Sequence, residues 1–368
     1  MTHVMQASRK IIFPKDSSSE FYFELKQRIA PLSAGSSKKV MLMPRLKVLL
    51  FPLLYLSAFV LLLMKGHQLS WFYFSYALLG LLLPLTVLNI VHDVLHHSLF
   101  KSAKVNRLAA YLLDLMGGNS YVWHKRHVHF HHSFSNIPGW DIDLEKKKIF
   151  RLSPTDKLRW VHRFQHFYMP LVYLLFTLHW VVFRDFKDYF HPQSMFRKKT
   201  KVPLARYLEL IAFKLFYFSY ILVIPILMWS HSWHHYLLGF VLLHAMASML
   251  TLMVILPTHW DENAVFRLPD SSLKMKESWA LHQLTTTNDY ATNQPILNFL
   301  LGGLNYHIAH HLFPNINHNY LPAITREVVI MSKEKNLPYK CFSLGGAIYS
   351  HFMLLKKNGY PVNIFEEE

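Results

Sequence analysis

The chain has 368 residues, of which 52% are hydrophobic and 12 are glycine, and its formal net charge is +17. The hydrophobic residues are gathered into long runs and the basic residues lie between them. We therefore predict a membrane protein whose basic segments face anionic lipid, and we expect no nucleic-acid partner. The single cysteine, Cys341, excludes an internal disulfide and argues against a thiolate metal site or an iron–sulfur cluster.

The N-terminal part, residues 1–47, is basic and interrupted by three prolines, and we interpret it as a cytosolic arm. Two apolar segments follow, 48–64 and 70–90. Each is close to the roughly 20 residues that a helix needs to cross a bilayer. Only the five residues 65–69 separate them, so we predict a transmembrane hairpin.

A first histidine motif, His92-Asp-Val-Leu-His96-His97, begins where the second apolar segment ends. Its imidazoles should therefore lie where the helix leaves the bilayer. The next apolar run, 105–118, is too short to cross a bilayer and contains Asp114, so we predict a re-entrant or interfacial helix there.

A second motif, HKRHVHFHH, covers residues 124–132 and holds five histidines. On an α-helix, His127 and His131 would lie one turn apart on one face, with His132 about 100° round the axis. His127 and His131 could then share one metal ion, while His132 could reach a second ion or an adjacent face.

The segment 164–183 is apolar but contains a glutamine, a proline and two histidines. Two clearer spans follow at 208–229 and 236–256, and a third motif, His307-Ile-Ala-His310-His311, comes after them. A crossing at 164–183 would place the second and third motifs on opposite sides of the membrane. If the histidines form one site, this segment must lie in the membrane interface.

Lysine and arginine are concentrated in the arm, in 91–163 and in 184–206, whereas the two short loops between spans contain only Lys65. The positive-inside rule therefore places both termini and all three motifs in the cytoplasm. The predicted fold class is an all-α integral membrane protein with four transmembrane helices in two hairpins and a cytosolic helical cap.

We divide the chain into three parts on this basis. They are the arm 1–47, a membrane domain 48–325 whose cap comprises 91–163 and 257–325, and a cytosolic C-terminal segment, 326–368.

The three motifs share one pattern that contains nine histidines. A zinc ion takes three or four protein ligands, so nine imidazoles fit two metal ions better than one. Two neighbouring redox metals can hold O2 as a bridge, and iron is the usual metal for that chemistry; two zinc ions are the alternative. Neutral imidazoles need acceptors that orient them, and the candidate carboxylates are Asp93, Asp141, Asp143 and Glu262.

The motifs and their surroundings resemble the integral-membrane fatty acid desaturases, most closely a bacterial acyl-CoA or acyl-lipid branch related to front-end desaturases. The resemblance covers about residues 70–325. The residues that carry it are His92-Asp-x-x-His96-His97, Trp123-x-x-x-His127-x-x-x-His131-His132, Asn136-x-x-Gly139-x-Asp141-x-Asp143, Gln165-His166-x-Tyr168, His259-x-x-Glu262 and the run Gly302–Pro314.

The resemblance implies a cytosolic cap that holds two irons above a tunnel for a fatty acyl chain. O2 and two electrons would be used to remove two hydrogens from adjacent methylenes and leave a cis double bond. The family's ligand roles would fall on the nine motif histidines and on a tenth, His259. The metal ligands expected are His92, His96, His97, His127, His131, His132, His259, His307, His310 and His311.

The chain departs from the front-end branch in two ways. His307 stands where that branch usually has glutamine, and no cytochrome b5 domain is recognisable. We therefore expect a separate electron donor, either ferredoxin or cytochrome b5 with its reductase. Two other functions stay open: a membrane hydroxylase or ketolase with the same metal site, and a non-redox zinc-binding membrane protein or transporter.

Overall fold

The computed structural model describes residues 11–15, 17–34, 40–145 and 148–361, and its regular structure there is almost entirely helical. The predicted all-α class is confirmed. Parts of the arm 1–47 and of the segment 326–368, including both chain ends, lie outside the described residues. The cytoplasmic location predicted for both termini stays a prediction.

Four helical rods are long and apolar enough to cross a membrane, as predicted. Each begins or ends a few residues beyond the apolar segment seen in the sequence. The rods are α2 (Leu42–Lys65); α3 (Leu69–Thr86) continued by η1 (Val87–Val91) and α4 (His92–Leu95); α12 (Leu204–Phe218) continued by η6 (Ser219–Val223) and α13 (Ile224–Met228); and α14 (Trp233–His259).

The α3 rod is the centre of the membrane part, because it packs against both α2 and α14. Its apolar window is 67% buried, whereas the windows of α2 and of the α12 rod are only 28% buried. The buried contacts include Leu62, Phe72, Leu79 and Leu243. The outer faces of α2 and α12 carry exposed leucines, as expected for surfaces in contact with lipid.

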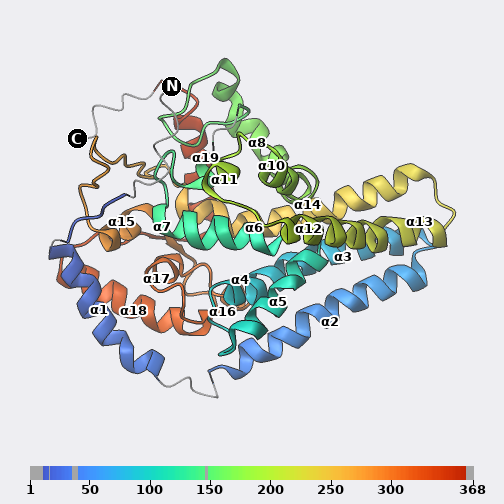
Figure 1. Cartoon of the computed structure of the whole chain (residues 1–368), viewed down its shortest axis with the longest axis horizontal. Coiled ribbons are helices and arrows are strands. Elements are labelled where there is room, and N and C mark those ends of the chain that lie inside the picture. The colour runs from blue at the N-terminus through green and yellow to red at the C-terminus, as the bar shows by residue number, and fades with distance from the viewer. Residues whose placement is uncertain (1–10, 16, 35–39, 146–147, 362–368) are drawn as a thin grey trace.

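A cap of short helices lies at one end of the rods, and the rods extend away from it to the right in Figure 1. One part of the cap packs around Phe21, Leu25, Leu284, Ile308 and Val328. Its helices are α1 (Ser17–Ala34), α15 (Trp279–Thr286), α17 (His307–Leu312) and α18 (Leu321–Glu334).

Smaller elements complete the cap. A two-residue parallel pair joins β1 (Asp289–Tyr290) to β2 (Cys341–Phe342). The others are α6 (Ser120–His124), η2 (Lys125–His131), α7 (His132–Phe134), η3 (Ile142–Leu144), α16 (Pro295–Leu300), η7 (His318–Tyr320) and α19 (Leu344–Lys357).

The predicted short helix at 105–118 is α5 (Ala103–Leu115), which starts where the Ser102 hydroxyl accepts a hydrogen bond from the Val105 N–H. Thirteen residues extend about 20 Å at 1.5 Å per residue, which is too short to cross a bilayer. The helix packs instead against η1, α4 and α12.

The segment predicted to lie in the interface is bent rather than straight. Its two halves, 160–173 and 176–199, meet at an angle of 76°. Gln165 and His166 are buried, whereas Phe167 and Leu171 are each 70% exposed. Taken together, the two halves are long and apolar enough to form a broken span or a re-entrant loop, so the interfacial position stays a prediction. Its elements are η4 (Trp160–Phe164), α8 (Gln165–Tyr173), α9 (Phe176–His179), η5 (Trp180–Arg184), α10 (Asp185–Phe190) and α11 (Met195–Lys199).

The close approach of α3 and α14 depends on Gly80. A Cβ atom at this position would lie 2.2 Å from the backbone carbonyl oxygen of Leu243. We expect Gly80→Ala to force the two helices apart and to cost about 1–3 kcal/mol of unfolding free energy. The thermal midpoint of the purified protein in detergent should fall accordingly.

The matched control is Gly345→Ala in α19, where an added Cβ would meet nothing within 4 Å. Alanine has the higher helix propensity, so this midpoint should stay unchanged or rise slightly. Equal midpoints for Gly80→Ala and the unmodified protein would contradict the packing argument.

Candidate metal centre

Nine of the ten predicted ligands converge in two neighbouring clusters. Within each cluster the candidate ligand nitrogens all lie within 4.8 Å of one another. The five-histidine cluster consists of His92, His96, His127, His132 and His310, and the four-histidine cluster consists of His131, His259, His307 and His311.

Helix α17 contributes to both clusters and joins them. His307 and His311 are four residues apart, so they share one helix face and enter the four-histidine cluster. His310 lies beside that face and enters the five-histidine cluster. The other ligands come from the end of the α3 rod, from the turn made by η2 and α7, and from the last residue of α14.

The second motif pairs its histidines differently from the α-helical expectation. The structure places His127 with His132, and it places His131 in the other cluster. The reason is that η2 is a π-helix, in which the His132 N–H bonds to the His127 carbonyl five residues earlier. This wider turn brings residues i and i+5 together, and π-turns of this kind are frequent at functional sites.

The proton positions in the four-histidine cluster follow from its hydrogen bonds. His259 Nδ1 donates to the Thr286 carbonyl at 3.1 Å, and His307 Nδ1 donates to the Leu304 carbonyl at 3.1 Å. Because a carbonyl only accepts, each Nε2 must keep a lone pair. The two Nε2 atoms are nevertheless 2.8 Å apart. Two lone pairs so close repel each other unless a cation lies between them.

The other two rings have the same tautomer. His131 Nδ1 lies 3.2 Å from Asp141 Oδ2, and His311 Nδ1 lies 2.8 Å from Gln283 Oε1. His131 Nε2 is 3.0 Å from His259 Nε2, while His311 Nε2 is buried without a hydrogen-bonding partner among the described residues. His259, His307 and His311 therefore turn an unprotonated Nε2 towards one point, and His131 does the same when its ring is neutral.

The five-histidine cluster has similar spacing. His127 Nε2 lies 3.0 Å from His92 Nε2 and 3.1 Å from His132 Nε2, which is 3.1 Å from His310 Nε2. Two nitrogens that are each about 2.1 Å from one metal ion and subtend about 90° at it would be about 3.0 Å apart. Both ring nitrogens of His96 are buried without a described partner. The donor atoms of both clusters therefore fit a metal ion.

The protonation of these rings also suits metal binding. Burial, reinforced by the neighbouring imidazoles, holds the pKa of most of the ligands outside the spanning rods well below the usual value, so they are neutral at neutral pH. Neutral imidazole is the form that binds a metal. These residues are His96, His127, His132, His307, His310 and His311.

His131 is the exception, because burial lowers its pKa but the charge of Asp141 outweighs that effect and raises it. Asp141 is fully buried and is itself fixed by the backbone N–H groups of Asn136 and Asp143, each at 2.9 Å. Of the four predicted carboxylates, Asp141 is the one whose oxygen lies within 3.5 Å of a ring nitrogen of a candidate ligand.

Asp143 lies one step further out, 3.8 Å from His131 Nδ1. Burial alone would raise the pKa of Asp143, but the guanidinium groups of Arg126 and Arg184 lower it to about 2. Both arginines approach its Oδ1 atom, at 3.3 and 2.9 Å. Asp143 therefore stays ionised and links the metal cluster to these arginines.

The structure gives Asp93 and Glu262 other surroundings. Asp93 Oδ2 accepts from His318 Nδ1 at 2.6 Å and from Asn317 Nδ2 at 2.7 Å, and its other oxygen is 3.9 Å from His92 Nδ1. Asp93 therefore anchors the chain that follows the third motif. Glu262 is half-buried, and its backbone N–H donates to Ser350 Oγ.

Several orienting groups were not predicted from the sequence. Gln283 in α15 and the carbonyls of Thr286 and Leu304 each fix one ring, as described above. A single glutamine and two backbone carbonyls form no sequence pattern from which their role could be predicted. His318 and its bond to Asp93 were also missed, because they lie 225 positions apart in the chain.

His97 is the one predicted ligand that the structure leaves out of both clusters. Its side chain is exposed, and its φ angle is +55°. Its ring centroid lies 6.4 Å from that of His124, the last residue of α6. The third histidine of the first motif thus points away from the other nine.

The fold and the two clusters define a class: a multi-pass, all-helical membrane protein with a candidate two-metal histidine centre at the ends of its spans. Comparison with known families agrees with this class. Residues 68–343 match the family model described as fatty acid desaturase, which is most of the chain. The protein belongs to the fatty acid desaturase family.

The relatives with assigned activities include desaturases from bacteria and plants. The chain is 34% identical over 274 residues to the sn-1 linoleoyl-lipid 6-desaturase of Arthrospira platensis, covering 73% of each chain. It is 29% identical over 280 residues to the enzyme of the same name from Synechocystis, covering 74% of this chain and 76% of that one. It is 28% identical over 353 residues to the acyl-lipid (8-3)-desaturase of Physcomitrium patens, covering 93% and 72%.

The role of Asp141 can be tested by metal content. Asp141→Asn keeps the shape but removes the charge that orients His131, so affinity for the ion in the four-histidine cluster should fall about 10- to 100-fold. Bound iron and zinc would both be measured by mass spectrometry after graded treatment of the purified protein with a chelator. The control is Glu262→Gln, which removes a carboxylate that contacts no ligand ring among the described residues and should retain its metal normally. Equal retention in both variants would contradict the assignment.

Proposed function

We propose that this protein is an O2-dependent fatty acyl desaturase that introduces a cis double bond at a histidine-ligated di-iron centre. The observation that carries the proposal is the pair of histidine clusters, whose rings present nine nitrogen donors in two groups joined by η2 and α17. Nine imidazoles exceed what one ion can bind, and two adjacent ions suit the activation of O2. Membership of the desaturase family supports the same reaction.

Two bound irons would supply O2 activation with two electrons from outside the protein. The reaction balances as R–CH2–CH2–R′ with O2, two electrons and two protons, giving R–CH=CH–R′ and two waters. The five-histidine cluster would hold one ion and the four-histidine cluster the other. Asp141 and Gln283 keep His131 and His311 in the tautomer that binds metal.

The position of the clusters suits a substrate that comes from the bilayer. His92 follows directly on η1 at the end of the α3 rod, and His259 is the last residue of α14. Both are buried, so the centre is shielded from bulk water. An acyl chain that stays in lipid could reach such a site without crossing solvent. The relatives' names refer to acyl lipids, which supports an acyl-lipid substrate here, with acyl-CoA as the other carrier.

The electron donor is proposed to be a separate ferredoxin or cytochrome b5 with its reductase. The positive-inside rule assigns the basic segments that carry the second motif to the cytoplasm, where these donors occur. A basic surface attracts an acidic carrier and speeds its encounter. Salt should therefore slow electron transfer to the protein.

The test is the fatty acid profile of a host that expresses the protein, measured by gas chromatography–mass spectrometry. The unmodified protein should produce a new unsaturated acid. His131→Ala and His310→Ala each remove one ligand from a different cluster, so both should abolish that product while the variants still insert into the membrane. Turnover at the unmodified rate in either variant would refute the ligand assignment.

The matched control is His234→Ala, a substitution of an exposed histidine in the first turn of α14, far along the rod from the clusters. It should leave the product unchanged. A hydroxylated product from the unmodified protein would move the assignment to a hydroxylase with the same centre. Zinc in place of iron in the purified protein, with no product, would favour the non-redox alternative.

A further inference from the structure

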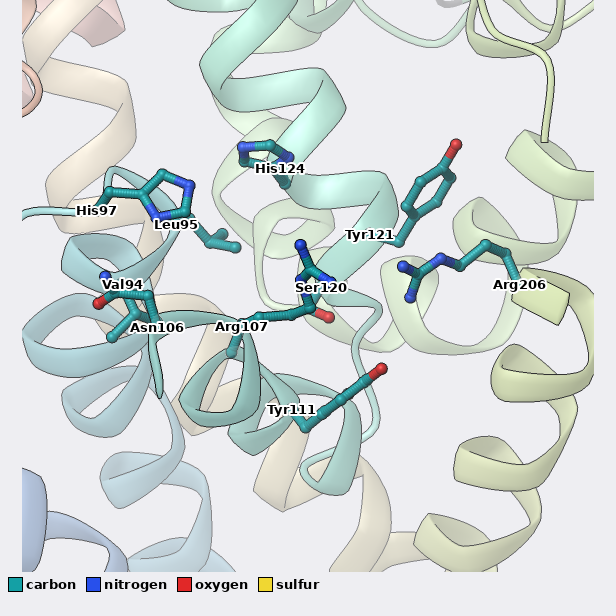
Figure 2. A pocket seen from close by; sticks show the side chains of 11 residues that line it. Val94, Leu95, His97, Asn106, Arg107, Tyr111, Ser120, Tyr121, His124 and Arg206 are labelled. Carbon is teal, nitrogen blue, oxygen red and sulfur yellow. The ribbon is translucent and has the colours of Figure 1, made fainter. Parts of the chain in front are cut away.

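A pocket of about 110 Å³ lies beside the five-histidine cluster, between α4, α5, α6 and α12. Figure 2 shows its lining side chains from these four helices. One wall is apolar and includes Val94, Leu95 and Ala110. The rest is polar and basic. Neither the metal ligands nor the reaction described above accounts for these polar groups.

The pocket is close to the candidate metal centre along two stretches of chain. His97 lines it and directly follows the ligand His96. His124 lines it and precedes the ligand His127 by three residues, or about 4.5 Å of helix. The pocket is therefore lined by two side chains whose chain neighbours are candidate ligands of the five-histidine cluster.

The backbone at His97 is held in a conformation that favours glycine. His97 ends α4 in a motif in which the Ser98 N–H bonds to the Asp93 carbonyl and the His97 N–H bonds to that of Val94. In helices that end in this way, the residue with positive φ is usually glycine. Here that residue is His97, with a φ of +55°. A histidine there destabilises the fold relative to glycine, and its side chain lines the pocket.

The charge of the pocket is positive. Arg107 from α5 and Arg206 from α12 both line it, and their guanidinium groups face the same space in Figure 2. Arg206 is paired with Glu209 and lies over the Tyr121 ring, with 5.0 Å from its guanidinium carbon to the ring centroid. Arg107 is exposed and no carboxylate among the described residues forms an ion pair with it, so it adds a net positive charge to the pocket lining.

We propose that this pocket binds the phosphate-bearing headgroup of the acyl substrate, with Arg107 and Arg206 as its charge partners and His97 as a contact. The inference rests on the proposed desaturase function. Guanidinium groups bind phosphate through two parallel hydrogen bonds, which makes arginine well suited to this ligand. The acyl chain would leave along the apolar wall towards the metal centre. Phosphate could belong to a phospholipid or to CoA.

Native mass spectrometry of the iron-loaded protein in detergent would test this by binding, without turnover. The probes are dioleoyl phosphatidylglycerol, oleoyl-CoA and monogalactosyl diacylglycerol, of which the last lacks phosphate. At least one phosphate-bearing probe should bind, and Arg107→Gln and Arg206→Gln should each weaken its binding about tenfold or more. Preference for phosphatidylglycerol identifies a lipid headgroup, and preference for oleoyl-CoA identifies CoA.

The control for charge is Arg326→Gln on α18, an exposed arginine that does not line the pocket. It should bind the probes as the unmodified protein does. Equal binding of the galactolipid, unchanged binding in both pocket variants, or no binding of any probe would each overturn the proposal. These outcomes do not depend on desaturation, so they are separate from a failure of the proposed function.

His97→Gly distinguishes a pocket contact from a metal ligand. Glycine relieves the backbone conformation, so the thermal midpoint should stay the same or rise, and iron content should be unchanged. Binding of the phosphate probe should weaken several-fold, and KM should rise with little change in kcat. Loss of iron would overturn the assignment and return His97 to the ligand set.

Discussion

The geometry of the four-histidine cluster depends on one constraint: each metal-facing imidazole must be unprotonated at Nε2 and protonated at Nδ1. In the four-histidine cluster this is enforced by four acceptors, which are a carboxylate, a side-chain amide and two backbone carbonyls. Without them a ring could turn or change tautomer, and its lone pair would no longer face the ion. Each acceptor in turn requires its own element to be in place. The need to orient these four rings therefore constrains where α15, the end of α14 and the start of α17 lie.

Arg126 connects the surroundings of the candidate metal centre to the bent segment. This side chain is only 2% exposed, and it binds Asp188 of α10, the Ile142 carbonyl and Asp143. Buried ion pairs contribute little net stability, but removing one partner from them is costly. Their effect here is geometric, because Arg126 lies in η2 directly before the candidate ligand His127. The bent segment 160–199 is thus tied to the candidate metal centre through Asp188 and Arg126.

The three motifs differ in how their histidines are used. The second motif places His131 in the four-histidine cluster and its other two cluster members in the five-histidine cluster. The third motif does the reverse, with His310 in the five-histidine cluster and its other two members in the four-histidine cluster. The first motif supplies two histidines to the five-histidine cluster. His97, which ends the first motif, faces a basic pocket instead. A histidine pair in the sequence therefore does not imply two ligands. The backbone at the end of α4 decides where the second ring points.

The sequence alone predicted the fold class, the four spans and eight of the nine histidines that meet in the clusters, because long apolar runs and repeated histidine spacing are local signals. His259 needed the family resemblance, since a single histidine at the end of a span has no pattern. The sequence also predicted Asp141 beside the second motif. It could not assign His127 and His131 to different clusters, because an α-helical turn was assumed and the π-turn of η2 changes which rings coincide.

Only the tertiary structure decided which ring nitrogens face each other, which groups orient them and which histidine is left out. These features join residues far apart in the chain, such as His131 with His259 and His311 with Gln283. Such contacts depend on how helices from both halves of the chain pack, and no local pattern encodes that. The sequence thus specified the donor atoms, and the packing of the cap specified the centre that they form.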